Sequence, residues 1–330
     1  MNFMPSKLFS LRFLFRCASF LFLFQTPAVA QNPGGIEWHY HSTLNFVMAY
    51  READHPLALR VLDELQQQQR RLAERLAFQP RRAITVYLCP TQYIFDCMTG
   101  GGVPHWGEAA ANTAQWRIYL KTPSANKARD LVPATVTHEL THLYLAELAQ
   151  PHSLPRWFSE GAAIFLSNEA RPADPMLISR ALLTHSLVDF EAIDDLLSFP
   201  NVRAALAYAE GYQAVNFMTQ RFGAHAITKF ARALATQPQS RLAFQAAFGE
   251  DIWDFETAYF DFLRQRFRWY FLLDESFLFG GIILLLLTAG FLVTRWRAKK
   301  KMQEWEAEDK VEDNSSPPEV DSDKNETSTP

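Results

Sequence analysis

The pattern of hydrophobic and polar positions predicts strands in the first part of the chain. Phe46–Tyr50, Ala83–Cys89 and Trp116–Leu120 are short runs rich in Val, Ile and aromatic residues, which is typical of strands. Between the first two runs, Leu57–Leu76 repeats its apolar residues at helical spacing, and a short helix is expected after Pro90. This part therefore predicts a small sheet packed with helices.

From about residue 129 the apolar spacing is helical almost throughout. The expected helices are 129–148, 155–167, 176–197, 203–221, 224–235, 240–248 and 252–270. The sequence thus predicts an α+β fold, in which a small N-terminal sheet with its helices precedes a mostly helical C-terminal half.

The first thirty residues have the pattern of a secretory signal peptide. Lys7, Arg12 and Arg16 precede an apolar stretch from Cys17 to Phe24. Ala28-Val29-Ala30 then places small residues at the positions that a signal peptidase reads. We expect cleavage after Ala30, with an uncleaved N-terminal anchor as the alternative.

A second apolar run predicts one transmembrane helix. Ser276–Thr294 carries no charge and is close to the roughly 20 residues that cross a bilayer. Asp274 and Glu275 precede it, and the residues that follow are rich in Lys and Arg as far as Lys301. Because excess Lys and Arg marks the cytoplasmic side, the C-terminus is expected in the cytoplasm and residues 31–274 outside it.

The expected organisation is a signal peptide at 1–30, an extracytoplasmic domain at 31–274, a transmembrane helix at 275–294 and a cytoplasmic tail at 295–330. The tail is polar and acidic, so we expect it to be disordered. Both glycosylation sequons, at Asn314 and Asn325, lie in this tail. Their absence from the outward part favours a bacterial periplasm, and hence a single-pass protein of the inner membrane.

Composition argues against two kinds of site. The formal net charge is −4 and no basic patch is evident, so nucleic-acid binding is not expected. The three cysteines include no Cys-x-x-Cys pair, which argues against a cysteine-based zinc site. Cys89 and Cys97 both lie in the outward part, where disulfides persist, so we expect a disulfide between them, with two buried free thiols as the alternative.

An HExxH motif, His138-Glu139-Leu140-Thr141-His142, lies within the expected helix 129–148. Residues four apart share one face of a helix, so both imidazoles can reach one ion, and zinc accepts neutral imidazole nitrogen. Glu139 would project beside the metal, where it can take a proton from a zinc-bound water. A satisfied pair of surface histidines is the alternative interpretation.

Glu160 is the candidate third ligand. It lies 18 residues after His142, in an apolar segment that is expected to be helical. Burying a carboxylate without a partner is costly, and His₂Glu is an established ligand set of catalytic zinc. An exposed carboxylate at a helix start is the alternative, which the HExxH motif just upstream disfavours.

The two segments HELTH, 138–142, and LPRWFSEGAAIFL, 154–166, resemble the glutamate-zincin metallopeptidases, and among them the bacterial peptidase MA-like domains. This clan includes thermolysin and the zinc aminopeptidases. The resemblance covers most of residues 37–270 and implies a gluzincin-like fold. It further implies Zn²⁺ bound by His138, His142 and Glu160, with Glu139 as the base in peptide-bond hydrolysis.

The chain also departs from parts of this clan. It has no Gly-x-Met-Glu-Asn segment, which the aminopeptidases use to hold a free amine, and no large N-terminal β-domain. Aminopeptidase activity is therefore not supported. The resemblance leaves the substrate as a peptide or protein without naming it.

The same resemblance suggests a donor to the transition-state oxygen. Clan members often use a Tyr or His from a helix well after the third ligand, and Ala207–Tyr212 lies some fifty residues beyond Glu160. Tyr208 and Tyr212 share a helix face because they are one turn apart. Tyr208 is the preferred donor, Tyr212 is the alternative and His105 is the next candidate.

Two weaker features leave alternatives open. Trp116–Leu120 is either the edge strand to which an extended peptide adds or an ordinary strand of the sheet. His39 and His41 alternate as on a strand, and are either metal ligands or ordinary core or surface histidines.

The sequence therefore predicts a membrane-anchored zinc metallopeptidase that acts outside the cytoplasm. The alternatives are a catalytically vestigial zinc-fold adaptor and an assembly factor for envelope proteins. The intact Glu139 favours the enzyme, because a merely structural zinc needs no base.

Overall fold

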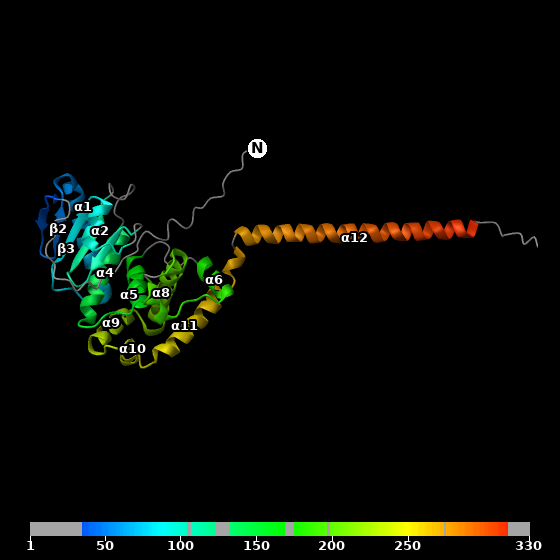
Figure 1. The fold of residues 1–330 in the computed structure, drawn as a ribbon. Coiled ribbons are helices and arrows are strands. Elements are labelled where there is room, and N and C mark those ends of the chain that lie inside the picture. The colour runs from blue at the N-terminus through cyan, green and yellow to red at the C-terminus, as the bar shows by residue number, and fades with distance from the viewer. Residues whose placement is uncertain are drawn as a thin grey trace, which may run out of the picture. The chain divides into compact units, whose positions relative to one another are not determined.

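The computed structural model describes residues 35–103, 107–122, 133–168, 175–196, 199–273 and 275–315. They divide into two compact units, the first ending at Tyr270 and the second beginning at Phe271. In Figure 1 the first unit contains the sheet, in its blue and cyan part, and a series of helices in green and yellow. The expected signal peptide at 1–30 lies outside the described residues.

A five-stranded sheet forms the N-terminal part of the first unit. Its strands are β1 (His39–Ser42), β2 (Phe46–Tyr50), β3 (Ile84–Cys89), β4 (Ala109–Asn112) and β5 (Arg117–Lys121). Their order is β1-β2-β3-β5-β4, in which β2, β3 and β5 are parallel and the two outer strands are antiparallel to their neighbours. The three strands that were expected from the sequence are therefore the central ones.

Strand β5 is an interior strand, which settles one of the open alternatives. It pairs with β3 on one side and β4 on the other, so β4 is the outer strand on this side of the sheet. All four residues of β4 are buried. The sequence Ala-Ala-Ala-Asn gave no strand signal, because alanine and asparagine are depleted in strands.

The two faces of the sheet pack against different helices. Alternate residues such as Val86 and Ile118 join the main core with α1 (His55–Leu76) and α4 (Pro133–Ala149). On the other face, Tyr119 and Ala110 join a smaller cluster with Phe95 of α2 (Gln92–Thr99). This alternation follows from the period of two along a strand.

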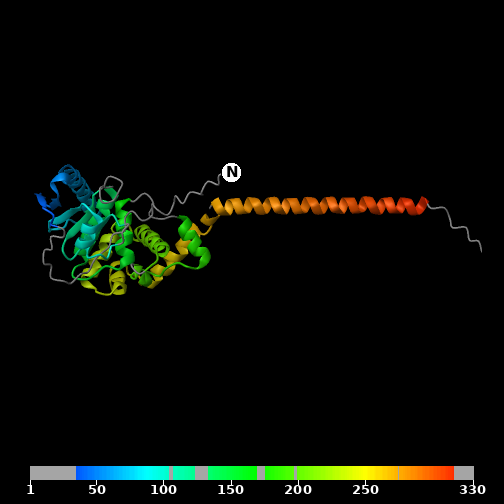
Figure 2. The ribbon, with the colours of Figure 1, turned by 45° about the horizontal axis from the view of Figure 1, so that its top comes forward.

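The helical half packs around α4. Its helices are α5 (Arg156–Ser167), α6 (Pro175–Thr184), α7 (Phe190–Ile193), α8 (Asn201–Phe222), α9 (Ala226–Thr236), α10 (Ser240–Phe248) and α11 (Ile252–Phe267). Helix α4 contacts α1, α5, α9 and β4, and α5 in turn packs along α8. Figure 2 shows the same succession of sheet and helices after a turn of the view.

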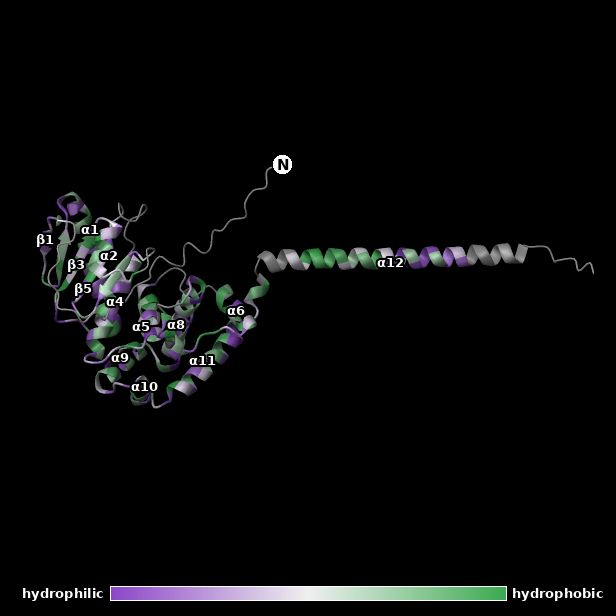
Figure 3. Cartoon of the chain, in the orientation of Figure 1, coloured by the Kyte–Doolittle hydropathy of each residue, from purple (hydrophilic) through white to green (hydrophobic). Residues whose placement is uncertain are grey.

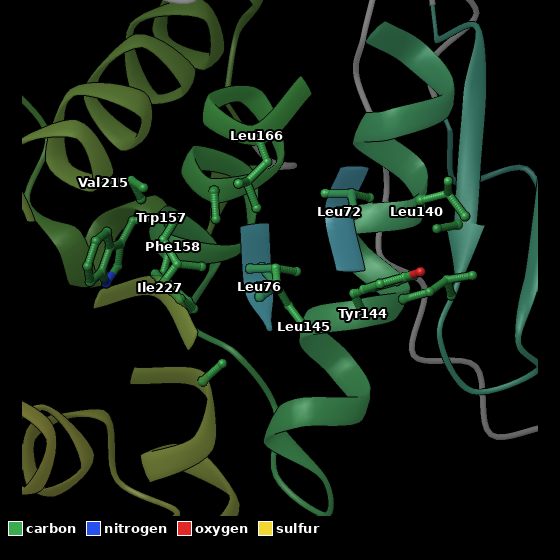
Figure 4. Close-up of a cluster of buried hydrophobic side chains, with 14 of the residues drawn as sticks. Leu72, Leu76, Leu140, Tyr144, Leu145, Trp157, Phe158, Leu166, Val215 and Ile227 are labelled. Carbon is green, nitrogen blue, oxygen red and sulfur yellow. The ribbon is translucent and has the colours of Figure 1, made fainter. Parts of the chain in front are cut away.

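Large apolar side chains fill the space between these helices. Figure 4 shows Leu72 and Leu76 of α1, Tyr144 of α4 and Phe158 of α5 among the residues of this core. Trp157 stacks on Phe190 with ring centroids 4.2 Å apart. These contacts hold α4 against α1 and α5, and α5 against α7.

The expected helix 176–197 is wrong, because the chain breaks at its middle. Helix α6 ends at Thr184, His185 has a left-handed φ of 53°, and the Ser186 amide donates to the Ala181 carbonyl over 2.9 Å. This bond pattern is the Schellman motif that terminates helices. The short helix α7 begins only at Phe190.

The second unit consists mainly of the long helix α12 (Glu275–Ser315). Within it, Gly280–Glu306 is long and apolar enough to cross a membrane, and it is the one such helix among the described residues. Between the grey ends of α12, Figure 3 shows a mainly hydrophobic stretch followed by a mainly hydrophilic one.

The helix continues past the apolar run, where the composition predicted disorder. Residues 295–315 are helical, while 316–330 lie outside the described residues. Lys, Glu, Arg and Ala make up more than half of this stretch, and these residues have high helix propensity. Lys300 and Glu304 also face each other one turn apart, with Nζ and Oε1 3.9 Å apart.

Candidate metal centre

Helix α4 carries the HExxH motif into the centre of the first unit. Every residue from Thr135 to Leu145 is buried, so the helix is enclosed on all sides. The Thr137 and Thr141 hydroxyls donate to the carbonyls one turn before them, over 2.9 and 2.8 Å. These internal bonds let polar threonines lie inside the protein without further partners.

Glu160 reaches the same place from helix α5. Its side chain is buried, as expected for a ligand and not for an exposed helix-start carboxylate. The next residue, Gly161, lies against α8, and a Cβ added there would lie 2.1 Å from the Gly211 carbonyl oxygen. The close approach of α5 and α8 therefore requires glycine directly beside Glu160.

The three predicted ligands converge on one point. Glu160 Oε2 lies 3.7 Å from His138 Nε2 and 3.7 Å from His142 Nε2. One ligand atom from each residue lies within 4.8 Å of the other two, and all three residues are buried. Ligands of tetrahedral zinc are roughly 3.3 Å apart, given metal–ligand distances of about 2.0–2.1 Å. A zinc-sized ion therefore fits with small side-chain adjustments.

The chemistry of the donor set also fits a cation. His142 Nε2 and Glu160 Oε2 are buried and have no hydrogen-bond partner among the described residues. Leaving two buried polar atoms without a hydrogen bond is costly, and a metal ion would satisfy both. The interpretation of His138 and His142 as a surface pair is wrong, since both rings are fully buried.

Ser159 is a functional candidate that the sequence pattern did not reveal. Its Oγ lies 3.0 Å from His142 Nδ1. A hydrogen bond from Nδ1–H to this hydroxyl selects the tautomer in which Nε2 offers its lone pair to a metal. The one available signal was its place directly before Glu160, which could not by itself identify the histidine that it contacts.

Burial also sets the charge state of His142. Desolvation lowers the pKa of its imidazole to about 4, although the nearby Glu160 acts in the opposite direction. His142 is therefore neutral at neutral pH, which is the form that binds metal. Glu139 follows His138 directly in α4, and its side chain is also buried.

The remaining candidates are the three possible oxyanion donors. Tyr208 is half-buried at the margin of the main core, and Tyr212 packs its ring against Phe165 with centroids 6.1 Å apart. His105 lies outside the described residues. The structure therefore leaves the choice of oxyanion donor as a prediction.

The structure also bears on two other sequence-based expectations. His39 and His41 do not join any group of three potential metal ligands among the described residues, and His39 instead faces Glu52, with Nδ1 and Oε2 3.5 Å apart. Cys89 and Cys97 are free thiols, so the expected disulfide is wrong. Cys89 is buried at the end of β3, whereas Cys97 is exposed on α2.

The sequence of the chain also matches a known protein family. A sequence model of the peptidase MA superfamily matches residues 65–265, which contain both motifs and most of the first unit. The chain belongs to the peptidase MA superfamily. A comparison with curated proteins gives no match. The peptidase MA domain thus extends from within α1 almost to the end of α11, and the buried His138, His142 and Glu160 cluster lies inside it.

Proposed function

We propose that this protein is a zinc-dependent metallopeptidase that hydrolyses peptide bonds outside the cytoplasm. The observation that carries the proposal is the buried His138, His142 and Glu160 cluster in a peptidase MA domain. Glu139, which follows His138 in the sequence, is buried as well. Two imidazoles and a carboxylate form a ligand set of catalytic zinc that keeps one position open.

Each residue has a distinct role in this proposal. His138, His142 and Glu160 hold the ion, and Ser159 orients His142 through Nδ1. Zinc bound there would polarise the scissile carbonyl and lower the pKa of a coordinated water. Glu139 accepts the proton of the attacking water and returns it to the leaving amine. Tyr208 donates a hydrogen bond to the oxyanion.

The main alternative is a vestigial zinc-fold protein that acts as an adaptor or assembly factor. The retained Glu139 favours the enzyme, because a purely structural site needs no proton acceptor. The two functions differ in turnover and not in metal content, so metal analysis alone cannot separate them.

Turnover of a generic peptide library by the full chain tests the enzyme directly. We expect cleavage by the wild type and its loss in Glu139→Gln, with zinc content unchanged. Glu147→Gln is a matched control, because Glu147 lies on the same helix and accepts a bond from the Arg81 amide. A wild type that binds zinc and cleaves no peptide would favour the adaptor.

The third ligand has its own test. Glu160→Ala should lower zinc affinity strongly, because it removes one of three protein ligands. Undiminished zinc binding in this variant would exclude Glu160 from the site.

We also propose that α12 anchors the enzyme in the inner membrane, with the catalytic unit in the periplasm. The apolar stretch of α12 and the basic residues after Thr294 support this orientation. A reporter fused after Pro330 should be active only if it works in the cytoplasm, and one fused at Asp274 only if it works outside. The reverse pattern would invert the proposed topology.

A further inference from the structure

The C-terminal end of α11 presents arginines and aromatic rings on its surface. Its inward residues, Leu263 and Phe267, are buried in the main core, so the segment is fixed to the catalytic unit. Outward lie Arg264, Arg266 and Arg268, followed by Trp269, which is 59% exposed, and Tyr270, which is 40% exposed. We call Arg264–Tyr270 the arginine–aromatic segment.

Two of the three arginines have no carboxylate partner. Arg264 pairs with Asp261, with Nη1 and Oδ1 2.6 Å apart. Among the side chains that the structure describes, which do not include those of Asp274 and Glu275, no carboxylate forms an ion pair with Arg266 or Arg268. The Arg268 guanidinium instead lies 4.7 Å from the centre of the Trp269 ring. Arg266 lies over the rings of Phe262 and Phe267 instead, 5.9 and 6.0 Å from their centres. The segment therefore offers two arginines without a carboxylate partner among the described side chains, and one of them, Arg268, lies next to an indole.

Favourable interaction with the helix dipole does not explain the whole arrangement. Basic residues are stabilising in the last turn of a helix, and this accounts for arginines near Phe267. It does not account for a Trp and a Tyr that remain exposed directly after them. Exposed aromatic rings together with arginines are typical of surfaces that lie at the headgroup level of a bilayer.

The short chain segment between Tyr270 and α12 indicates that lipid is the partner of the arginine–aromatic segment. Helix α12 begins at Glu275, only five residues after Tyr270. Fully extended, five residues span at most about 18 Å. If α12 crosses the membrane, as we propose, the arginine–aromatic segment cannot lie far from the surface where α12 enters.

We propose that the arginine–aromatic segment binds anionic lipid headgroups, through Arg266 and Arg268, with Trp269 and Tyr270 at the interface. The contact adds a second attachment to the bilayer, one that belongs to the catalytic unit itself. It does not depend on a bound metal, so its failure is distinguishable from failure of the proposed peptidase.

Vesicle binding by residues 31–273 tests this proposal in the absence of α12. The described core is drawn entirely from residues before Phe271, so this fragment retains the whole core of the first unit. We expect it to sediment with vesicles that contain equal parts of phosphatidylglycerol and phosphatidylcholine, and not with pure phosphatidylcholine. High salt should weaken the binding, because exposed charges are screened.

The variants locate the binding surface. Each basic residue near an anionic membrane contributes about fivefold to binding, so Arg266→Glu/Arg268→Glu should reduce it by at least about tenfold. Arg266→Lys/Arg268→Lys should bind almost as well as wild type. Arg60→Glu/Arg70→Glu makes the same charge change at exposed positions of α1 and should leave binding unaltered. Trp269→Ser should bind more weakly while keeping its salt dependence.

Three results would overturn the proposal. If Arg60→Glu/Arg70→Glu on α1 reduced vesicle binding as much as Arg266→Glu/Arg268→Glu, net charge alone would drive binding. Unchanged binding in Arg266→Glu/Arg268→Glu would place the lipid contact elsewhere. The third result is that the fragment does not bind vesicles but associates with itself, and that Trp269→Ser abolishes this self-association. The segment would then be an interface between copies of the chain. Far-ultraviolet circular dichroism on each variant confirms that it has folded.

Discussion

His142 Nδ1 lies 3.0 Å from Ser159 Oγ, so the residue directly before Glu160, the proposed third ligand, also contacts the proposed ligand His142. Helix α5 thereby contributes to the candidate metal centre twice, through Ser159 and through Glu160. A partner on the outer nitrogen of a ligand histidine typically changes metal affinity by about 10–100-fold.

We therefore expect Ser159→Ala to weaken zinc binding by about tenfold or more, because His142 loses the bond that selects its tautomer. Competition with a chromophoric chelator measures this affinity without any assay of activity. Ser167→Ala is the matched control, because Ser167 is also buried on α5 but donates to the Ile164 carbonyl. Equal affinity in Ser159→Ala and wild type would show that Ser159 has no orienting role.

Gly161→Ala should destabilise the first unit by about 1–3 kcal/mol or more, because an added Cβ would lie 2.1 Å from the Gly211 carbonyl oxygen. The obstructing atom is backbone, so no rotation of a side chain can relieve the clash. This cost must exceed the roughly 1 kcal/mol that alanine normally gains over glycine within a helix. Urea denaturation of the first unit measures the change.

The effect should follow the geometry of the helix crossing. A Cβ at Gly211 meets its nearest atom, the Trp157 carbonyl oxygen, at 2.9 Å. Gly211→Ala is therefore expected to cost less than Gly161→Ala. The opposite ranking would contradict the close approach of α5 and α8 as described.

Glu210 predicts a dependence of stability on pH. Burial raises the pKa of its carboxyl well above 4.5, although the Val188 amide donates to both carboxylate oxygens, at 3.2 and 3.1 Å. Because the folded state holds this proton more tightly than the unfolded state, the contribution of Glu210 to stability is fully present below about pH 4.5. It is lost as the pH rises through the folded-state pKa.

Glu210→Gln should remove this loss, because an amide stays neutral and its oxygen can still accept from Val188. We expect the variant to match wild type near pH 4 and to be more stable at pH 8, as measured by urea unfolding at both values. Glu256→Gln should show a smaller gain, since the pKa of Glu256 is raised by burial that is only partial. A variant that is less stable than wild type at pH 8 would refute this account.

Local pattern was sufficient to pick out the three side chains that converge as a candidate metal site. His138 and His142 are fixed by a helical spacing of four, and Glu160 was identified by the cost of a carboxylate in an apolar helix. The central strands were equally clear because their Val, Ile and aromatic residues favour strands. These features depend on neighbours in sequence, and the structure confirms that the three candidate ligands converge.

Features that depend on tertiary contact were not predictable. Strand β4 is built from alanines and is a strand because it pairs with β5. The end of α6 at His185 depends on a left-handed residue that is neither Gly nor Asn. Ser159 contacts His142 only because α4 and α5 pack together, and no rule of sequence spacing connects the two residues.

Tyr208 is the proposed donor to the oxyanion, and its hydroxyl gives a clean test. Tyr208→Phe should lower kcat by about a hundredfold or more, since removal of one oxyanion donor typically costs that much. Zinc content and folding should be unchanged, because the ring that packs at the margin of the core is retained. Tyr212→Phe is the matched control on the same helix, one turn away, where the ring contacts Phe165. Single-turnover kinetics, on a library peptide that the wild type cleaves, separates the chemical step from binding.

A normal rate in Tyr208→Phe together with a slow rate in Tyr212→Phe would exchange the roles of the two tyrosines. Normal rates in both variants would exclude both tyrosines as the oxyanion donor, and His105 would then be the next residue to substitute.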